Sequence, residues 1–354
     1  MALITDATMG LIRDQIGLQN EKLRNFAALY ASSTWAQIQL DVKTLTRAAL
    51  IAKYPIGTEL VCKYTMDNVE YDCPWVVLDN DRDCTWQDGS VHQGLWLGMK
   101  YCTIEDMQFD APEGVVITAD DETVAEAGYY YCGVSGSTYT MLNLAAGDTI
   151  PFGDYDSIRK GIINHKDVYQ YGYNRYRDSA QRQWLNSAEG KGNWWEETHY
   201  GDAAPSQLAT RAGFMAGLDA DFLAVITPVK VQVSTNTVTD GGDTDVMYDK
   251  FFLQSSEEVY GIPQAAGIEG AYFPYWKEIT GLDAPTNGSG SNTNPARQIR
   301  RINSPSGSAA YVRLRSAHRG YSHSAWAVNS TGYLYTGYGV AALSFASQPA
   351  CVIS

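Results

Sequence analysis

The sequence predicts an α+β fold built of short strands, few helices and long ordered loops. Apolar residues recur at spacings of three and four mainly near the N-terminus, which is typical of amphipathic helices. From residue 56 onward the apolar runs are short, alternate with polar residues and end at Gly or Pro, as strands do. The chain also has 24 Tyr against 9 Phe and 9 Trp, which favours strands that carry aromatic side chains at the surface.

Residues 1–53 are expected to be a helical segment that is separate from the rest of the chain. Thr34 can cap a helix, with Gln37 completing a capping box. A helix of about four turns is marginal alone in water, so its apolar side must dock on the chain's own body or on a partner. We expect attachment or oligomerisation through this segment, with a trimer favoured over a monomer whose helices pack intramolecularly. The apolar seam consists of Trp35, Ile38, Val42, Leu45 and Ala49.

Residues 54–112 and 113–153 are the first part of the predicted body and a β-rich insert. Alternating patterns predict body strands at 59–64 and 71–78, with Trp75 in the core, and a further strand is expected at 95–99. Two insert strands are expected to pair, at 129–132 and 139–144. An ordinary hairpin extension is the alternative interpretation of the insert.

Residues 154–354 form the main predicted domain. One helix is expected to begin at a cap on Asp178 or Ser179 and to end at Leu185. The remaining predicted helices, in chain order, are at 206–218, capped by Ser206, and at 255–258. The predicted strands are at 222–233, interrupted by Pro228, and at 250–253, 311–314 and 350–353.

The charge of the chain is uneven. The net charge is −14, so non-specific binding to nucleic acid is not expected. Asp283 is the last acidic residue, and beyond it the chain has six Arg and no Lys, which leaves the preceding part at about −20. We expect these Arg residues to anchor loops by pairing with carboxylates of the acidic body. They are Arg297, Arg300, Arg301, Arg313, Arg315 and Arg319.

The six Cys lie at 62, 73, 84, 102, 132 and 351, and their spacing matches no zinc site. We therefore expect free thiols in a reducing compartment. The sequence also has no basic start followed by an uninterrupted apolar run, and no run of membrane-spanning length. Synthesis in the cytoplasm as a soluble product, without membrane insertion, is the expectation.

No stretch of the sequence has a pattern that commits the chain to catalysis. The acidic loop at 240–245 resembles a cation loop, but it lacks the calcium-loop spacing and the closing Glu. The adjacent pairs Glu196/Glu197 and Glu257/Glu258 are expected to point apart or to lie at a helix start, not to act as a glycosidase pair. We expect no catalytic residues, no metal and no cofactor.

A polar, aromatic patch lies between the predicted strands at 311–314 and 350–353. Tyr gives a large rigid contact area, and Ser, Gly and Asn give adaptable polar contacts, which is typical of antibody-type binding loops. The alternative is a Tyr-rich turn region whose rings merely pack. The candidate ligand-binding residues are His318, Tyr321, Ser322, His323, Ser324, Asn329, Ser330, Tyr333, Tyr335 and Tyr338.

Several short segments, in this order, resemble the C-type-lectin-fold variable proteins of phages and prophages, the targets of diversity-generating retroelements. They are RQWLN at 182–186, GFMAGLDADFLA at 213–224, TNTVTDGG at 235–242, KFFL at 250–253, EVYG at 258–261, LRS at 314–316, VN through Gly332 and PAC at 349–351. The resemblance implies a C-type-lectin-like domain with a hypervariable C-terminal patch, written by adenine-directed mutagenesis. It departs at 346–349, where ASQP replaces the usual close, and it lacks the calcium-dependent sugar signature of animal lectins.

The resemblance thus implies a receptor-binding variable protein on the surface of a phage particle. Its expected partners are a host cell-surface protein or glycan and, through residues 1–53, other virion proteins. An enzyme on the same fold, such as a formylglycine-generating-type oxidase or a hydrolase, is the rival. The resemblance to such an oxidase implies a two-Cys site in the C-terminal half, but this chain has only Cys351 there. A purely structural virion protein is the third possibility.

Overall fold

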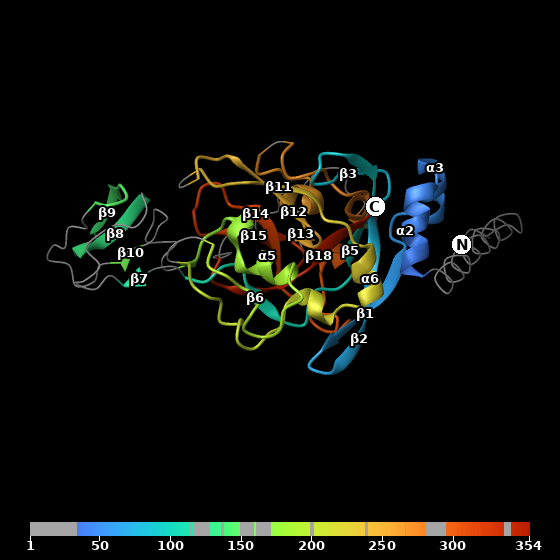
Figure 1. Cartoon of the computed structure of the whole chain (residues 1–354), viewed down its shortest axis with the longest axis horizontal. Coiled ribbons are helices and arrows are strands. Elements are labelled where there is room, and N and C mark those ends of the chain that lie inside the picture. Colours follow the sequence, from blue (N-terminus) through green and yellow to red (C-terminus); the bar gives the residue numbers. More distant parts are fainter. Residues whose placement is uncertain are drawn as a thin grey trace, which may run out of the picture.

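The computed structural model mixes helices with several sheets, as an α+β fold does (Figure 1). It describes residues 34–112, 115–116, 128–135, 138–148, 159–160, 171–198, 202–237, 240–265, 267–280, 295–335 and 341–354. In this part of the chain no helix is long and apolar enough to cross a membrane.

The first sheet has five antiparallel strands in the order β1-β2-β5-β18-β13. Three of them confirm the strands predicted in the first part of the body, and β18 confirms the one predicted at the end of the chain. Because β18 lies between β5 and β13, the last residues of the chain complete a sheet that the first part of the body begins. The bounds are β1 Glu59–Met66, β2 Val69–Asp79, β5 Leu95–Met99, β13 Phe252–Leu253 and β18 Pro349–Ile353.

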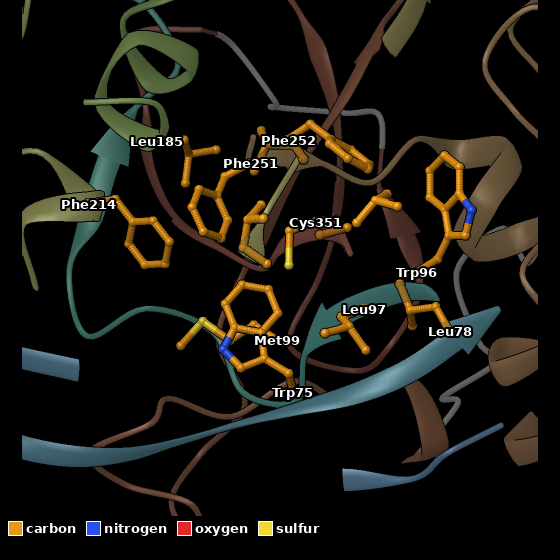
Figure 2. Packing of buried hydrophobic residues seen from close by; sticks show 14 of the residues in the cluster. Trp75, Leu78, Trp96, Leu97, Met99, Leu185, Phe214, Phe251, Phe252 and Cys351 are labelled. Carbon is orange, nitrogen blue, oxygen red and sulfur yellow. The ribbon is translucent and has the colours of Figure 1, made fainter. Parts of the chain in front are cut away.

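The apolar core includes the buried side chains of this sheet and contains Trp75, as predicted (Figure 2). The Trp75 ring is fully buried and contacts the rings of Phe222, at 5.1 Å, and Phe251, at 5.8 Å. Trp184 joins the same core through Phe214. Five cysteines, Cys62, Cys73, Cys84, Cys102 and Cys351, are buried free thiols, in agreement with the sequence-based expectation.

The helix predicted to carry the apolar seam is divided into two short helices, α2 (Trp35–Thr44) and α3 (Arg47–Lys53). Thr34 accepts a hydrogen bond from the backbone N–H of Gln37, as predicted, but the Gln37 side chain bonds Asp41 instead of closing the capping box. The seam docks on the chain's own body. Trp35 packs on Phe222 of α6 (Ala220–Val225) at 4.5 Å, and α2 also contacts β18. Residues 1–33, the first part of the predicted helical segment, lie outside the described residues.

The second sheet has the order β16-β15-β14-β17-β6, in which β14 and β17 are parallel and the other neighbours antiparallel. Strand β6 comes from the first part of the body, so this sheet too joins early and late residues. The C-terminal patch lies on the loops and edge strands of this sheet. The bounds are β6 Asp106–Gln108, β14 Val312–Ala317, β15 Ala325–Val328, β16 Leu334–Tyr335 and β17 Ser344–Ser347.

Two smaller pairs and several short helices complete the body. Ribbon β11–β12 and hairpin β3–β4 contact each other through β11 and β3. Their bounds are β3 Asp83–Thr85, β4 Val91–Gln93, β11 Val229–Ser234 and β12 Thr244–Asp249. The helices are η1 Tyr176–Asp178, α5 Ala180–Leu185, η2 Phe214–Gly217, α7 Ser256–Tyr260, α8 Pro274–Thr280 and η3 Pro295–Arg297. Ser179, one of the two predicted caps, caps α5, and the helical turn predicted at 255–258 is α7, which Ser255 caps.

The predicted insert is a separate four-stranded sheet in the order β7-β10-β8-β9, drawn apart from the body in Figure 1. Its two long strands pair as expected. One inner strand, β10, lies beyond the predicted end of the insert at residue 153. The bounds are β7 Val115–Val116, β8 Gly128–Ser135, β9 Thr138–Leu144 and β10 Arg159–Lys160.

Two predicted elements are wrong. The run at 222–233 begins as helix α6 and becomes a strand only after Pro228, because Phe222 and Val225, three residues apart, both reach the core from one helix face. The helix predicted at 206–218 is a set of turns and η2. Gly213 there approaches the Ser187 carbonyl so closely that a Cβ would lie 2.3 Å from its oxygen. Because Gly213 packs so closely on the Ser187 backbone, the chain does not continue there as a regular helix.

Candidate ligand-binding surface

The structure places the candidate residues that it describes on the loop that joins β14 to β15, on the turn that joins β15 to β16 and, for Tyr335, on β16 itself. Among these described candidates, only Tyr321 is well exposed, at 52%. Six are half-buried, namely His318, His323, Asn329, Ser330, Tyr333 and Tyr335. Tyr338 lies outside the described residues.

Ser322 and Ser324 correct the expectation of a uniformly exposed patch, because they are 1% and 6% exposed. Their backbones explain this burial. The Ser322 carbonyl accepts a hydrogen bond from the backbone N–H of Asn174, and the Ser324 carbonyl accepts one from the N–H of His318. The 318–324 loop therefore turns inward at Ser322 and Ser324, and the side chains of Tyr321 and His323 are more exposed than these two.

A buried amide, Asn174, holds this loop. Its side-chain NH₂ group donates to the carbonyl oxygens of Tyr321, at 2.6 Å, and Ser324, at 2.8 Å, with the His318 carbonyl as a more distant acceptor at 3.3 Å. Asn174 is fully buried and precedes η1. All of these acceptors are backbone atoms, so the contact is independent of which side chains the loop carries.

A second buried amide, Asn236, positions the first. Its side chain donates to Asn174 Oδ1 at 3.0 Å and to Asp240 Oδ2 at 2.9 Å. The neighbouring Thr237 backbone N–H donates to the Arg319 carbonyl at 2.9 Å. Arg319 in turn donates its guanidinium to the carbonyl of Thr235. The loop is thus bound to the segment between β11 and β12 through backbone groups as well.

The carboxylates of the acidic loop at 240–245 bind other side chains of the protein. Asp240 accepts hydrogen bonds from Tyr173 and Asn236, and Asp245 pairs with Arg175 at 2.7 Å. Across the described ranges, no group of three or more His, Cys, Asp or Glu side chains is placed to hold a metal ion. The geometry of this loop therefore serves the scaffold of the surface.

Aromatic side chains gather above the loop. His318 stacks on Trp326 of β15 at 5.5 Å with nearly parallel rings, and it also contacts Tyr321 at 4.7 Å. His323 lies between Tyr321 and Tyr171. Burial lowers the pKa of His318 below its ordinary value, so this ring is neutral at pH 7 and accepts a hydrogen bond from the Gly320 backbone N–H at its Nδ1.

A second aromatic group, the Tyr311 cluster, consists of Tyr311, Tyr335 and Phe345. Tyr311 is 39% exposed and contacts the other two rings at 5.7 and 5.4 Å. Arg313 of β14 lies beneath it, with its guanidinium 4.2 Å from the Phe345 ring. Burial lowers the pKa of Arg313 to about 9, which still leaves the group charged at pH 7.

The Arg residues beyond Asp283 pair with carboxylates less often than predicted. Arg315 pairs with Glu258 and Arg301 with Asp106. Others donate to backbone carbonyls, as Arg300 does to Gly307 and Arg313 to Ala325 and Leu343.

Sequence reasoning missed the parts of this surface that lie outside the patch. Asn174, Asn236, Trp326 and Tyr311 shape it, but nothing in their spacing marks them. Among the residues that the structure describes, the Ser322 hydroxyl and the Trp326 indole N–H are buried without a hydrogen-bond partner. Such groups in a native protein call for an explanation, and a bound polar group would satisfy them.

Residues 157–354 match the family model described as a domain of unknown function, DUF6273. The match covers more than half of the chain, so the chain belongs to this family. No curated protein and no solved structure matches the chain. The family region contains the whole candidate surface, whereas β1, β2, β5 and β6 of the two main sheets lie before it.

Proposed function

We propose that this protein is a non-enzymatic, ligand-binding protein whose ligand contacts the surface around the 318–324 loop. The observation that carries the proposal is that Asn174 holds the loop through backbone carbonyl oxygens alone. The aromatic side chains above it, Tyr321 foremost, can therefore differ while the loop keeps its shape. Tyr, His and Trp also supply the rigid contact area that binding surfaces use.

The finer proposal is that the fold is C-type-lectin-like and that the surface is the variable patch of a diversity-generating retroelement target. The short strands and long ordered loops of the body support the fold, and the composition of 318–338 supports the patch. The protein would be displayed on a phage particle and bind a host-surface protein or glycan. Because α2 and α3 dock on the body, attachment to the particle or to sister subunits falls to residues 1–33.

The nucleotide sequence of the 3′ end of this gene in sibling genomes tests the proposal. We expect substitutions concentrated at adenines in the codons of His318, Tyr321, His323, Tyr333 and Tyr335, with a template copy and a reverse transcriptase nearby. Codons of the buried β15 residues Ala325 and Ala327 should stay unchanged. Substitutions spread evenly along the gene, or mainly at silent positions, would rule out the variable-patch proposal.

No observation specifically favours the two alternative functions, an enzyme on the same fold or a structural virion protein. A formylglycine-generating-type enzyme would need reactive thiols, but Cys351 is fully buried in the first sheet and burial raises the pKa of its thiol well above the ordinary value. A structural virion protein would use the same aromatic surface between sister subunits. We expect no turnover and no metal dependence, and stoichiometric calcium, zinc or copper in the purified protein would contradict this.

A further inference from the structure

A second site lies away from the 318–324 loop, in a cavity of about 300 Å³ beside ribbon β11–β12. Its walls are Lys230 and Gln232 of β11, the start of hairpin β3–β4 with Arg82, and the chain near Ile268. Its floor includes Trp96 of β5 and Phe252 of β13. This volume is at the lower end of the range for small-molecule sites, so a compact ligand fits.

Arg82 is held rigidly at the mouth of this cavity. Its carbonyl accepts a hydrogen bond from the Trp96 indole N–H at 3.1 Å, and its Nη2 donates to the Ala271 carbonyl at 2.7 Å. The guanidinium also lies 4.3 Å from the Phe273 ring. Its Nη1 comes no closer than 3.8 Å to the Glu258 carboxylate, which is too far for a hydrogen bond. Its Nε pairs with the Asp79 carboxylate at 3.2 Å, so Nη1 is the nitrogen left to donate into the cavity.

Strand β11 adds two more donors. Lys230 and Gln232 are half-buried and alternate with the buried Val229, Val231 and Val233, so both side chains lie on the cavity side of the strand. Within the described part of the chain, neither the Lys230 ammonium nor the Gln232 amide has a hydrogen-bond or ion-pair partner. Arg82 Nη1 is a third donor at the cavity, while the rest of the Arg82 guanidinium binds the Ala271 carbonyl and the Asp79 carboxylate.

The carboxylates of the cavity wall do not neutralise these donors. Glu258 is committed to the buried Arg315 and to the Ser255 backbone N–H, as part of the α7 capping box. Asp83 pairs with Arg47 on α3. Arg315 itself donates to the carbonyls of Leu253 and Glu269. The excess charge that faces the cavity is therefore positive and comes from Lys230.

The floor of the cavity is apolar and aromatic. Trp96 and Phe252 are both buried and meet edge to face at 6.1 Å, and Ile268 closes one side. A ligand that fills this space must therefore combine an anionic end with an apolar body. A multiply charged anion fits less well, because burying each further charge without a partner costs several kcal/mol.

We propose that this cavity binds a small organic monoanion, a carboxylate with a compact apolar or aromatic body. The carboxylate receives hydrogen bonds from Lys230, Gln232 and Arg82 Nη1, and the body lies against Trp96 and Phe252. The cavity is separate from the ligand surface proposed above and does not depend on it.

The full-length chain can be titrated with 4-fluorobenzoate and followed by ¹⁹F NMR of the probe. We expect saturable binding at millimolar probe, weaker binding of the neutral 4-fluorobenzamide, and an affinity for 4-fluorobenzoate about tenfold lower in Lys230→Gln. Lys230 is partly exposed, so this variant should melt like the parent. Lys191→Gln is the matched control, because its ammonium pairs with Asp67 elsewhere, and it should bind like the parent. Absence of saturable binding, equal binding of the amide, or an unchanged affinity in Lys230→Gln would overturn the proposal.

Discussion

The sheet around Trp75 and the 318–324 loop are held by different atoms. In the sheet, buried side chains from β2, β5, β13 and β18 pack on one another (Figure 2). In the loop, the buried side chain of Asn174, which Asn236 positions, holds backbone carbonyls, while the rings of Tyr321 and His318 lie above them. Side-chain identity therefore matters most in the sheet and least at the tip of the loop.

This difference shows how one chain can combine a fixed body with a surface whose side chains can change. A core side chain contributes through burial and close packing, so each deletion costs transfer energy and leaves a cavity. A backbone carbonyl contributes the same hydrogen bond whatever residue it belongs to. The contrast predicts a graded series of effects.

The largest effect is expected from removing whole strands. The family region 157–354, produced alone, lacks β1, β2, β5 and β6, so β18 loses its neighbour β5 and β17 loses its neighbour β6. We expect no cooperative thermal unfolding, whereas the full chain unfolds cooperatively. A sharp transition in the fragment, with dispersed amide signals, would show that the family region is self-sufficient.

Tryptophan replacements compare the two regions directly. Trp75→Ala should lower the free energy of unfolding by about 3–5 kcal/mol, because the ring is fully buried among Phe222 and Phe251. Trp326→Ala, at the surface and stacked on His318, should cost about 1–2 kcal/mol. Urea denaturation of both variants measures this, and equal losses would mean that the surface is packed like the core.

The buried ion pair Arg315–Glu258 belongs to the body and should behave accordingly. Glu258→Gln leaves the Arg315 charge without its carboxylate, which should cost about 3 kcal/mol. The neighbour Glu257 is the matched control. Burial raises the pKa of Glu257, so its charge is unfavourable in the folded chain and Glu257→Gln should cost little. Denaturant melts in which both variants behave alike would contradict the assignment.

A smaller effect is expected at Asp41, which ties α2 to α3. Burial acts to raise its pKa, but hydrogen bonds from Lys53, Tyr54 and Gln37 outweigh it and hold the pKa below the ordinary 3.8. A lowered folded-state pKa contributes stability that is present above 3.8 and is lost as pH falls through the lower value. Asp41→Asn should therefore cost about 1–2 kcal/mol at pH 7.

This cost should shrink below the pH at which Asp41 takes up a proton. Melting temperatures of the parent and of Asp41→Asn, recorded from neutral pH down to about pH 3, provide the measurement. A difference that stays constant across this range would mean that the Asp41 charge contributes nothing.

Much of the body could be predicted from local sequence, because its signals are local. Alternating apolar residues identify β1 and β2, a short apolar run identifies β5, and the possible cap Ser179 identifies the start of α5. The run at 222–233 failed because a helix and a strand can both bury a short apolar segment. In the folded chain Phe222 lies on helix α6 and packs on Trp35, Trp75 and Phe251, which come from distant parts of the sequence.

The surface was less predictable, because long-range contacts decide it. Composition identified the Tyr, Ser and His residues, but the burial of Ser322 and Ser324 follows from Asn174, which is far away in sequence. Tyr311 and Trp326 join the surface through the pairing of β14, β15 and β16. A residue pattern contains no record of such pairings.

The most direct test compares the side chains of the loop with the amide that holds it. Free energies of unfolding can be measured by urea denaturation for Asn174→Ala and for the double variant Tyr321→Ala/His323→Ala. We expect Asn174→Ala to cost about 3 kcal/mol, because it leaves several loop carbonyls unpaired. The double variant should cost less than about 1 kcal/mol. The reverse order, with the double variant the more damaging, would show that the side chains hold the loop and would contradict the account.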